Sequence, residues 1–214
     1  MNINFLISET ENFIRQCIRD YDSGHDWWHI ERVRKLSLFI NKEEDIADPF
    51  ILEIASLLHD SVDSKFPGNN IEQVERFLDF HGLSEIKEKV IYVIQNVSYS
   101  NKIPSGELSL PELLIIQDAD RLDAMGAIGI ARAFNYGGFI NNVIYNPDIE
   151  TSTNLTGDKQ NKASSSTISH FYDKLLVLKY RMNTLTAKRL AAEKHDFMEV
   201  FLKQFYKEWY FNQE

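Results

Sequence analysis

The sequence predicts an all-α protein, and three of its features support that prediction. Apolar residues recur at the spacing of amphipathic helices through nearly all of the 214 residues. Runs of alternating apolar and polar residues, which are typical of half-buried strands, do not form a convincing set. Hydrophobic residues make up 43% of the chain and aromatic residues 12%, so a sizeable core is expected. Because no repeat or shift of composition marks a linker, we expect one helical domain over residues 1–214.

Five helices are predicted before residue 100, from apolar stripes and from terminal signals. They cover residues 3–20, 26–41, 49–60, 70–81 and 84–97. Val33 and Ile40 lie on the apolar stripe of the second helix. Pro49 suits a first helical turn, and the helix that follows it is apolar almost all round, so it should be buried in the centre. Gly82 should end the fourth helix, and Ser84 should be the N-cap of the fifth.

Three more helices are predicted in the second half of the chain. They cover residues 109–134, 165–181 and 184–210. Ser109 and Glu112 stand at the spacing of a capping box, and the helix that they begin has no obvious break before Phe134. The longest loop should run from residue 137 to 164, and a connection of that length is usually a functional lid or a mobile segment.

The bulk composition argues against several classes of function. A net charge of −9 disfavours broad binding to nucleic acid or to anionic membranes, because both need basic surface. The single cysteine, Cys17, cannot form an intrachain disulfide and suits a reducing compartment. The N-terminus lacks the basic and apolar regions of a signal peptide, and no stretch is long and apolar enough to span a bilayer. We therefore expect a soluble, cytoplasmic protein with no nucleic-acid or membrane partner, and the oligomeric state stays open.

Polar residues occupy positions where apolar ones are expected. His29 lies four residues before Val33 on the core-facing stripe, and His25 lies one turn earlier. Taken alone, such a histidine is more often a satisfied core residue than a ligand. Asp60 follows His59 at the end of the buried helix, where the partial negative charge of the helix C-terminus disfavours a carboxylate by about 0.3–1 kcal/mol. A divalent cation or a basic side chain should compensate, unless Asp60 simply begins a solvated turn.

Three more carboxylates stand inside an otherwise apolar helix, at Asp118, Asp120 and Asp123. Arg121 could neutralise one of them but not all three. A buried network of ion pairs is the alternative to a metal site, and we favour the metal site because the histidines and Asp60 complete a ligand set. Two imidazoles and two carboxylates suit one divalent ion such as Mn, Fe, Co, Ni, Zn or Mg, whereas one thiol is too few for a cysteine-rich zinc site.

The motifs "HIERV", "LLHD" and "DADRLDAMGAIG", in this order, resemble the HD superfamily of metal-dependent phosphohydrolases. The resemblance implies a helical HD-domain fold with a metal site between central helices. It also implies the ligands His29, His59, Asp60 and Asp120, and it alone selects Asp120 over Asp118. Four matching blocks span residues 25–184 and are similar to a subfamily of small stand-alone bacterial proteins. That subfamily implies hydrolysis of nucleoside triphosphates to a monophosphate and pyrophosphate, while the superfamily implies only hydrolysis of phosphoester or phosphoanhydride bonds.

The resemblance also suggests which groups handle protons and phosphates. Asp63, three residues after Asp60, matches an acidic residue that other members often use as a general acid or base, and a role as an exposed turn residue is equally compatible. We place Asp60 and Asp63 in the catalytic set. Binding of a triphosphate needs local cations, and each candidate could instead be an ordinary surface or ion-pair residue. The candidates for substrate binding are His25, Arg32, Lys65, Arg121, His170 and Lys174.

Other functions stay open at the level of the sequence. A nucleotidase or a phosphodiesterase of the same superfamily would use the same metal ligands. A non-catalytic domain that binds a nucleotide and regulates a partner is disfavoured, because all four matched ligand positions are filled. A structural helical protein with buried ion pairs would bind no metal.

Overall fold

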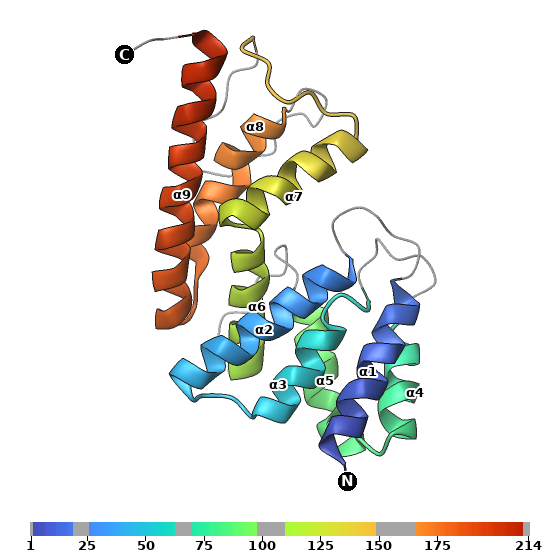
Figure 1. Ribbon diagram of the computed structural model, residues 1–214. Helices are drawn as coiled ribbons and strands as arrows, with labels where there is room; N and C mark the ends of the chain where they lie inside the picture. The colour runs from blue at the N-terminus through green and yellow to red at the C-terminus, as the bar shows by residue number, and fades with distance from the viewer. Residues whose placement is uncertain (1, 19–25, 63–69, 98–109, 149–165, 212–214) are drawn as a thin grey trace. The chain divides into compact units, whose positions relative to one another are not determined.

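The fold was analysed in a computed structural model, which describes residues 2–18, 26–62, 70–97, 110–148 and 166–211. Every regular element within these ranges is a helix, so the predicted all-α class is confirmed (Figure 1). The chain divides into two compact units, Met1–Asp120 and Arg121–Glu214, and each is described by itself. No helix among the described residues has the length and apolar character that crossing a bilayer requires.

The first unit is built around α3 (Pro49–Leu58), which packs against α1 (Ile3–Cys17), α2 (Trp27–Glu44) and α5 (Ser84–Asn96). The remaining helices of this unit are α4 (Ile71–Phe80), which packs on α5, and most of α6 (Pro111–Asp123). The apolar side chains of α3 are fully buried from Leu52 to Leu58, as its sequence predicts. The central helix therefore ends inside the protein, where its last residues are held away from water.

The turn between α4 and α5 corrects one expectation. Gly82 ends α4 with a φ of +70°, as predicted, and the N–H of Leu83 donates to the carbonyl of Leu78 at 2.8 Å. This tight turn leads directly into α5, so Leu83 is the N-cap residue and Ser84 is the first residue of the helix. The Ser84 hydroxyl donates to Asp79 Oδ1 at 2.8 Å and does not cap the helix, so the predicted role of Ser84 is wrong.

The second unit contains α7 (Gly126–Phe139) and α9 (Leu185–Tyr210), which pack against each other. Three short elements lie between them in the sequence. They are the α-helix α8 (Thr167–His170), the π-helical turn η2 (Phe171–Leu175) and the 3₁₀ segment η3 (Leu176–Arg181). The last helix supplies a row of aromatic rings at intervals of four residues, Phe201, Phe205 and Trp209. Tyr145 packs edge-on against the rings of Phe205 and Trp209 at centroid distances of 5.8 and 5.1 Å.

The helix predicted without a break over residues 109–134 is interrupted. Met125 is extended, with a φ of −119° and a ψ of 164°, and Gly126 has a φ of +69°, so α6 ends at Asp123 and α7 begins at Gly126. A side chain at position 126 would meet Lys194, whose Cγ lies 3.0 Å from the position of a Cβ. The Lys194 ammonium also donates to the Met125 carbonyl at 3.4 Å. At the break the chain therefore contacts a residue of α9, and the local sequence pattern does not reveal this contact. Most of the predicted 137–164 loop lies outside the described residues, and so does Ser109.

Candidate metal centre

Two histidines and two aspartates from three helices of the first unit converge on one point. His29 lies in the first turn of α2, His59 and Asp60 follow α3 directly, and Asp120 lies near the end of α6. The Nε2 atom of His29 lies 3.3 Å from Nε2 of His59, 3.4 Å from Oδ2 of Asp60 and 3.5 Å from Oδ1 of Asp120. The Nε2 atom of His59 lies 3.5 Å from Oδ1 of Asp60. The structure therefore groups His29, His59 and Asp120 as possible ligands and places the carboxylate of Asp60 against both imidazoles.

These spacings fit one divalent cation. Ligand atoms about 2.1 Å from a common ion stand about 3.0–3.4 Å from one another in octahedral or tetrahedral geometry. The ligand atoms of His29, His59 and Asp120 all lie within 4.8 Å of one another. Both imidazoles are fully buried, and the side chains of Asp60 and Asp120 are 12% and 33% exposed. The two imidazoles are therefore shielded from solvent, whereas the carboxylate of Asp120 is partly accessible. Such an arrangement suits an ion that also binds substrate or water.

Local hydrogen bonds orient both imidazoles. Asp26 is the N-cap of α2, and its carboxylate accepts from the backbone N–H of His29 at 2.8 Å. The helix α2 therefore begins with a side-chain cap, and His29 lies in its first turn. Nδ1 of His59 lies 2.7 Å from the carbonyl of Ser56. Because a carbonyl only accepts, Nδ1 carries the proton, and the lone pair of Nε2 points at the other ligands.

The three aspartates of α6 have different surroundings. Asp120 belongs to the ligand cluster, whereas Asp118 is fully buried and supplies none of the grouped ligand atoms. Asp123, which is 2% exposed, pairs with Arg132 at 2.5 Å, and both residues belong to the second unit. The ion-pair explanation thus accounts for Asp123, while the ligand explanation accounts for Asp120.

The predicted substrate-binding residues are distributed over both units. His25, Asp63 and Lys65 lie outside the described residues. Arg32 lies on α2, one turn after His29, and is half-buried. Arg121 belongs to the second unit, where its guanidinium donates to the carbonyl of Arg181 at 2.6 Å. Part of the donor capacity of Arg121 is therefore used within the protein.

His170 and Lys174 also belong to the second unit, at the join of α8 and η2. Burial, which is the largest cause, and the nearby charge of Lys174 together lower the pKa of His170 from 6.5 to about 4, against the opposing effect of Asp173. His170 is consequently neutral at pH 7, so it would meet a phosphate as a hydrogen-bonding group and not as a cation.

The lowered pKa of His170 predicts a dependence of stability on pH. Above pH 6.5 the side chain is neutral in both states, and between pH 6.5 and 4 only the unfolded chain takes up the proton. The unfolding free energy of wild type should therefore fall between pH 7 and pH 5 by about 2 kcal/mol more than that of a His170→Asn variant. Urea unfolding at both pH values measures the difference. Parallel losses in the two proteins would contradict the pKa of about 4.

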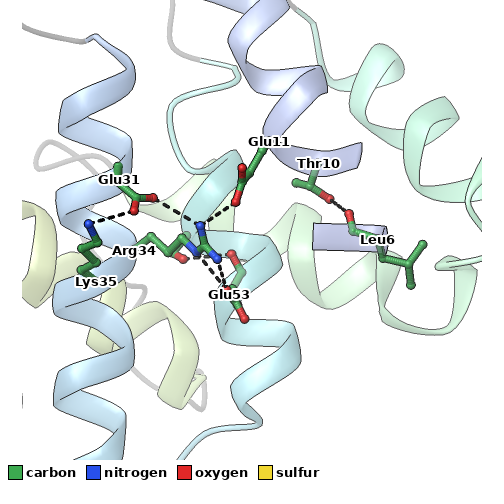
Figure 2. Close-up of polar contacts among 8 residues, drawn as sticks. Leu6, Thr10, Glu11, Glu31, Arg34, Lys35 and Glu53 are labelled. Carbon is green, nitrogen blue, oxygen red and sulfur yellow. Dashed lines mark hydrogen bonds and ion pairs between the residues drawn. The ribbon is translucent and has the colours of Figure 1, made fainter. Parts of the chain in front are cut away.

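Sequence reasoning missed Arg34, which joins three helices of the first unit. Its guanidinium contacts Glu11 of α1, Glu31 of its own helix and Glu53 of α3 (Figure 2). The charge pattern offered one signal, because Glu31 and Arg34 stand three apart on one helix. The partners on α1 and α3 are 23 and 19 residues away in the sequence and could not be read from that pattern.

Comparison with known proteins identifies the family. The sequence profile of the HD domain family matches residues 27–125. YpgQ of Bacillus subtilis (strain 168), an uncharacterized protein, is 38% identical over 208 residues, which cover 94% of this chain and 92% of YpgQ.

Solved structures agree with the sequence comparison. The crystal structure of Bacillus subtilis YpgQ in complex with ADP matches with a TM-score of 0.76 and 35% identity, covering 94% of this chain and 97% of that one. The crystal structure of an HD-superfamily hydrolase from Bacillus thuringiensis matches with a TM-score of 0.77 and 37% identity, covering 97% of this chain and 98% of that one. The matching profile and these relatives agree with the cluster of histidines and aspartates. Together they show that the chain belongs to the HD-domain superfamily and has the fold of its hydrolases.

Proposed function

We propose that this protein is a metal-dependent phosphohydrolase that converts nucleoside or deoxynucleoside triphosphates to monophosphates and pyrophosphate. The observation that carries the proposal is the convergence of His29, His59, Asp60 and Asp120 within 3.3–3.5 Å contacts. A nucleotide is favoured as substrate because the relative YpgQ was crystallised with ADP. On this proposal residues 1–214 act together as one phosphohydrolase domain.

The reaction adds water across the anhydride bond between the α- and β-phosphates. The water oxygen bonds to one of the two phosphorus atoms, and the bond from that phosphorus to the bridging oxygen breaks. A monophosphate and pyrophosphate are released, and the proton of the water passes to a base or to solvent. A divalent cation bound by the four ligands would lower the pKa of water and neutralise phosphate charge. The sequence resemblance assigns the proton-handling role to Asp63.

The protein's own contribution is to hold the ligands in a fixed arrangement. Asp60 faces both imidazoles, with Oδ2 toward His29 and Oδ1 toward His59. The Ser56 carbonyl holds the protonated Nδ1 of His59, so that Nε2 keeps its lone pair for the metal. We assign phosphate binding to Arg32, which is one turn from a ligand, and to Lys65, Arg121, Lys174, His170 and His25.

A panel of nucleotides tests the substrate class. The purified protein should release pyrophosphate from nucleoside triphosphates in the presence of Mn, Co, Ni or Mg, and metal-free protein should release none. Pyrophosphate and orthophosphate are measured separately in each reaction. Release of orthophosphate alone would favour a nucleotidase, cleavage of diesters would favour a phosphodiesterase, and binding without turnover would favour a regulatory domain.

A further inference from the structure

Arg34 is held by three carboxylates from three helices. Its Nε and Nη2 atoms donate to Oε1 of Glu53 at 2.9 and 2.5 Å, and Nη1 donates to Glu11 at 2.7 Å and to Glu31 at 3.3 Å. The side chain is 19% exposed, so it is largely shielded from water. Burial alone would lower the pKa of Arg34, but the hydrogen bonds and charge of Glu53, with the charges of Glu31 and Glu11, raise it above its usual value. Figure 2 shows the guanidinium between the helices that carry these carboxylates.

The contact between Arg34 and Glu53 lies close to the ligands along both helices. Arg34 is five residues after His29 on α2, and Glu53 is six residues before His59 at the end of α3. At the rise of an α-helix these separations are about 8 and 9 Å along the axis. The two helices are thus joined at similar distances from the point where Nε2 of His29 and Nε2 of His59 come within 3.3 Å.

A forked contact is suited to fixing the position of one helix along the axis of its neighbour. Two N–H groups of the guanidinium reach one carboxylate oxygen, so a slide of α2 along α3 would lengthen both bonds at once. The contact with Glu11 differs in one respect, because α1 carries none of the four ligands. The same guanidinium therefore makes one contact that joins two ligand-bearing helices and one contact that does not.

We propose that Arg34 is a positioning residue, which holds α2 against α3 through Glu53 so that the imidazoles of His29 and His59 converge. This inference rests on the proposed metal-dependent function. Arg34 does not touch the ligands, and it acts through the position of the helices.

Two matched variants separate positioning from general stabilisation. Glu53→Ala and Glu11→Ala each remove one carboxylate from the same guanidinium, and both should lower the urea midpoint of the full chain. Glu53→Ala should also weaken Mn²⁺ binding about tenfold, the scale seen when supports of metal ligands are removed. Glu11→Ala should bind Mn²⁺ as wild type does. Electron paramagnetic resonance titration measures free Mn²⁺ in both.

A second measurement does not need the metal. Proteins with ¹⁵N-labelled histidine, free of metal, should show shifted Nε2 resonances of His29 and His59 in Glu53→Ala but not in Glu11→Ala. The inference is overturned if Glu53→Ala matches wild type in Mn²⁺ affinity and imidazole resonances, or if both variants change alike. If wild type binds no Mn²⁺, the proposed function fails, and the imidazole resonances still decide the role of Arg34.

Discussion

Replacing Asp120 by asparagine should abolish retention of a divalent metal and slow turnover by about a thousandfold, which corresponds to about 4 kcal/mol. Asparagine keeps the shape of the side chain but loses the charge that holds a hard cation. The Asp120 side chain is 33% exposed and faces His29, so the variant should melt close to metal-free wild type. Metal content after gel filtration, measured by elemental analysis, and the rate of pyrophosphate release test this expectation.

Asp118 provides the matched control for Asp120, because it lies two residues earlier on the same helix. Its side chain is fully buried, so Asp118→Asn should lower the melting temperature, because an amide cannot reproduce every interaction of a buried carboxylate. It should retain the metal, because Asp118 supplies none of the grouped ligand atoms. Loss of metal from Asp118→Asn with retention in Asp120→Asn would reverse the assignment made from the family resemblance.

Replacing Lys89 by methionine should destabilise the protein by about 2–3 kcal/mol, because it leaves the carboxylate of Glu112 buried without a cation. Glu112 is 1% exposed, and its Oε1 atom accepts from Lys89 at 2.7 Å and from the backbone N–H of Asp48 at 3.3 Å. The loss should be smaller than for a fully isolated charge, because the contact at the N-terminus of α3 remains. A fall of about 5–10 °C in melting temperature is expected for a chain of this size.

Lys87→Met is the control for Lys89→Met, since Lys87 lies two residues earlier on α5. Lys87 pairs with Asp79, whose side chain is 47% exposed, so its removal should leave the melting temperature near that of wild type. A Glu112→Met change added to Lys89→Met should recover stability, because the uncompensated charge is then removed. Equal effects of the two lysine substitutions would show that the Glu112 contact contributes no more than a surface pair.

The ligand set was predictable because each ligand interrupts an apolar pattern. His29 stands on the stripe that continues through Val33, and Asp60 ends a helix with an almost wholly apolar sequence. Such positions need a compensating charge, and this requirement follows from the sequence alone. The choice between Asp118 and Asp120 does not follow from it, because both lie in the same apolar helix. The tertiary structure separates them, because Asp120 lies with His29 and His59 in the group of possible ligand atoms and Asp118 does not.

Contacts between distant segments were not predictable from local patterns. Glu112 was expected to form a capping box with Ser109, which lies outside the described residues, and the structure adds two partners, Lys89 of α5 and the backbone N–H of Asp48 at the start of α3. At the break before Gly126, the Met125 carbonyl accepts from Lys194, which is 69 residues away in the sequence. These partners of Glu112 lie 23 and 64 residues away in the sequence, so the packing of other helices decides that the bonds form.

The sequence by itself determined the helical class, most helix boundaries and three members of the proposed metal site, His29, His59 and Asp60, whereas it indicated Asp120 only through the family resemblance. It could do so because helix periodicity, end signals and the cost of burying charge are properties of short segments. The tertiary structure alone decided which aspartate joins the histidines, where α6 ends, and that Arg34 joins α2 to α3. These outcomes depend on atoms brought within about 3 Å by the packing of distant helices, and hydrogen bonds and ion pairs form only at that range.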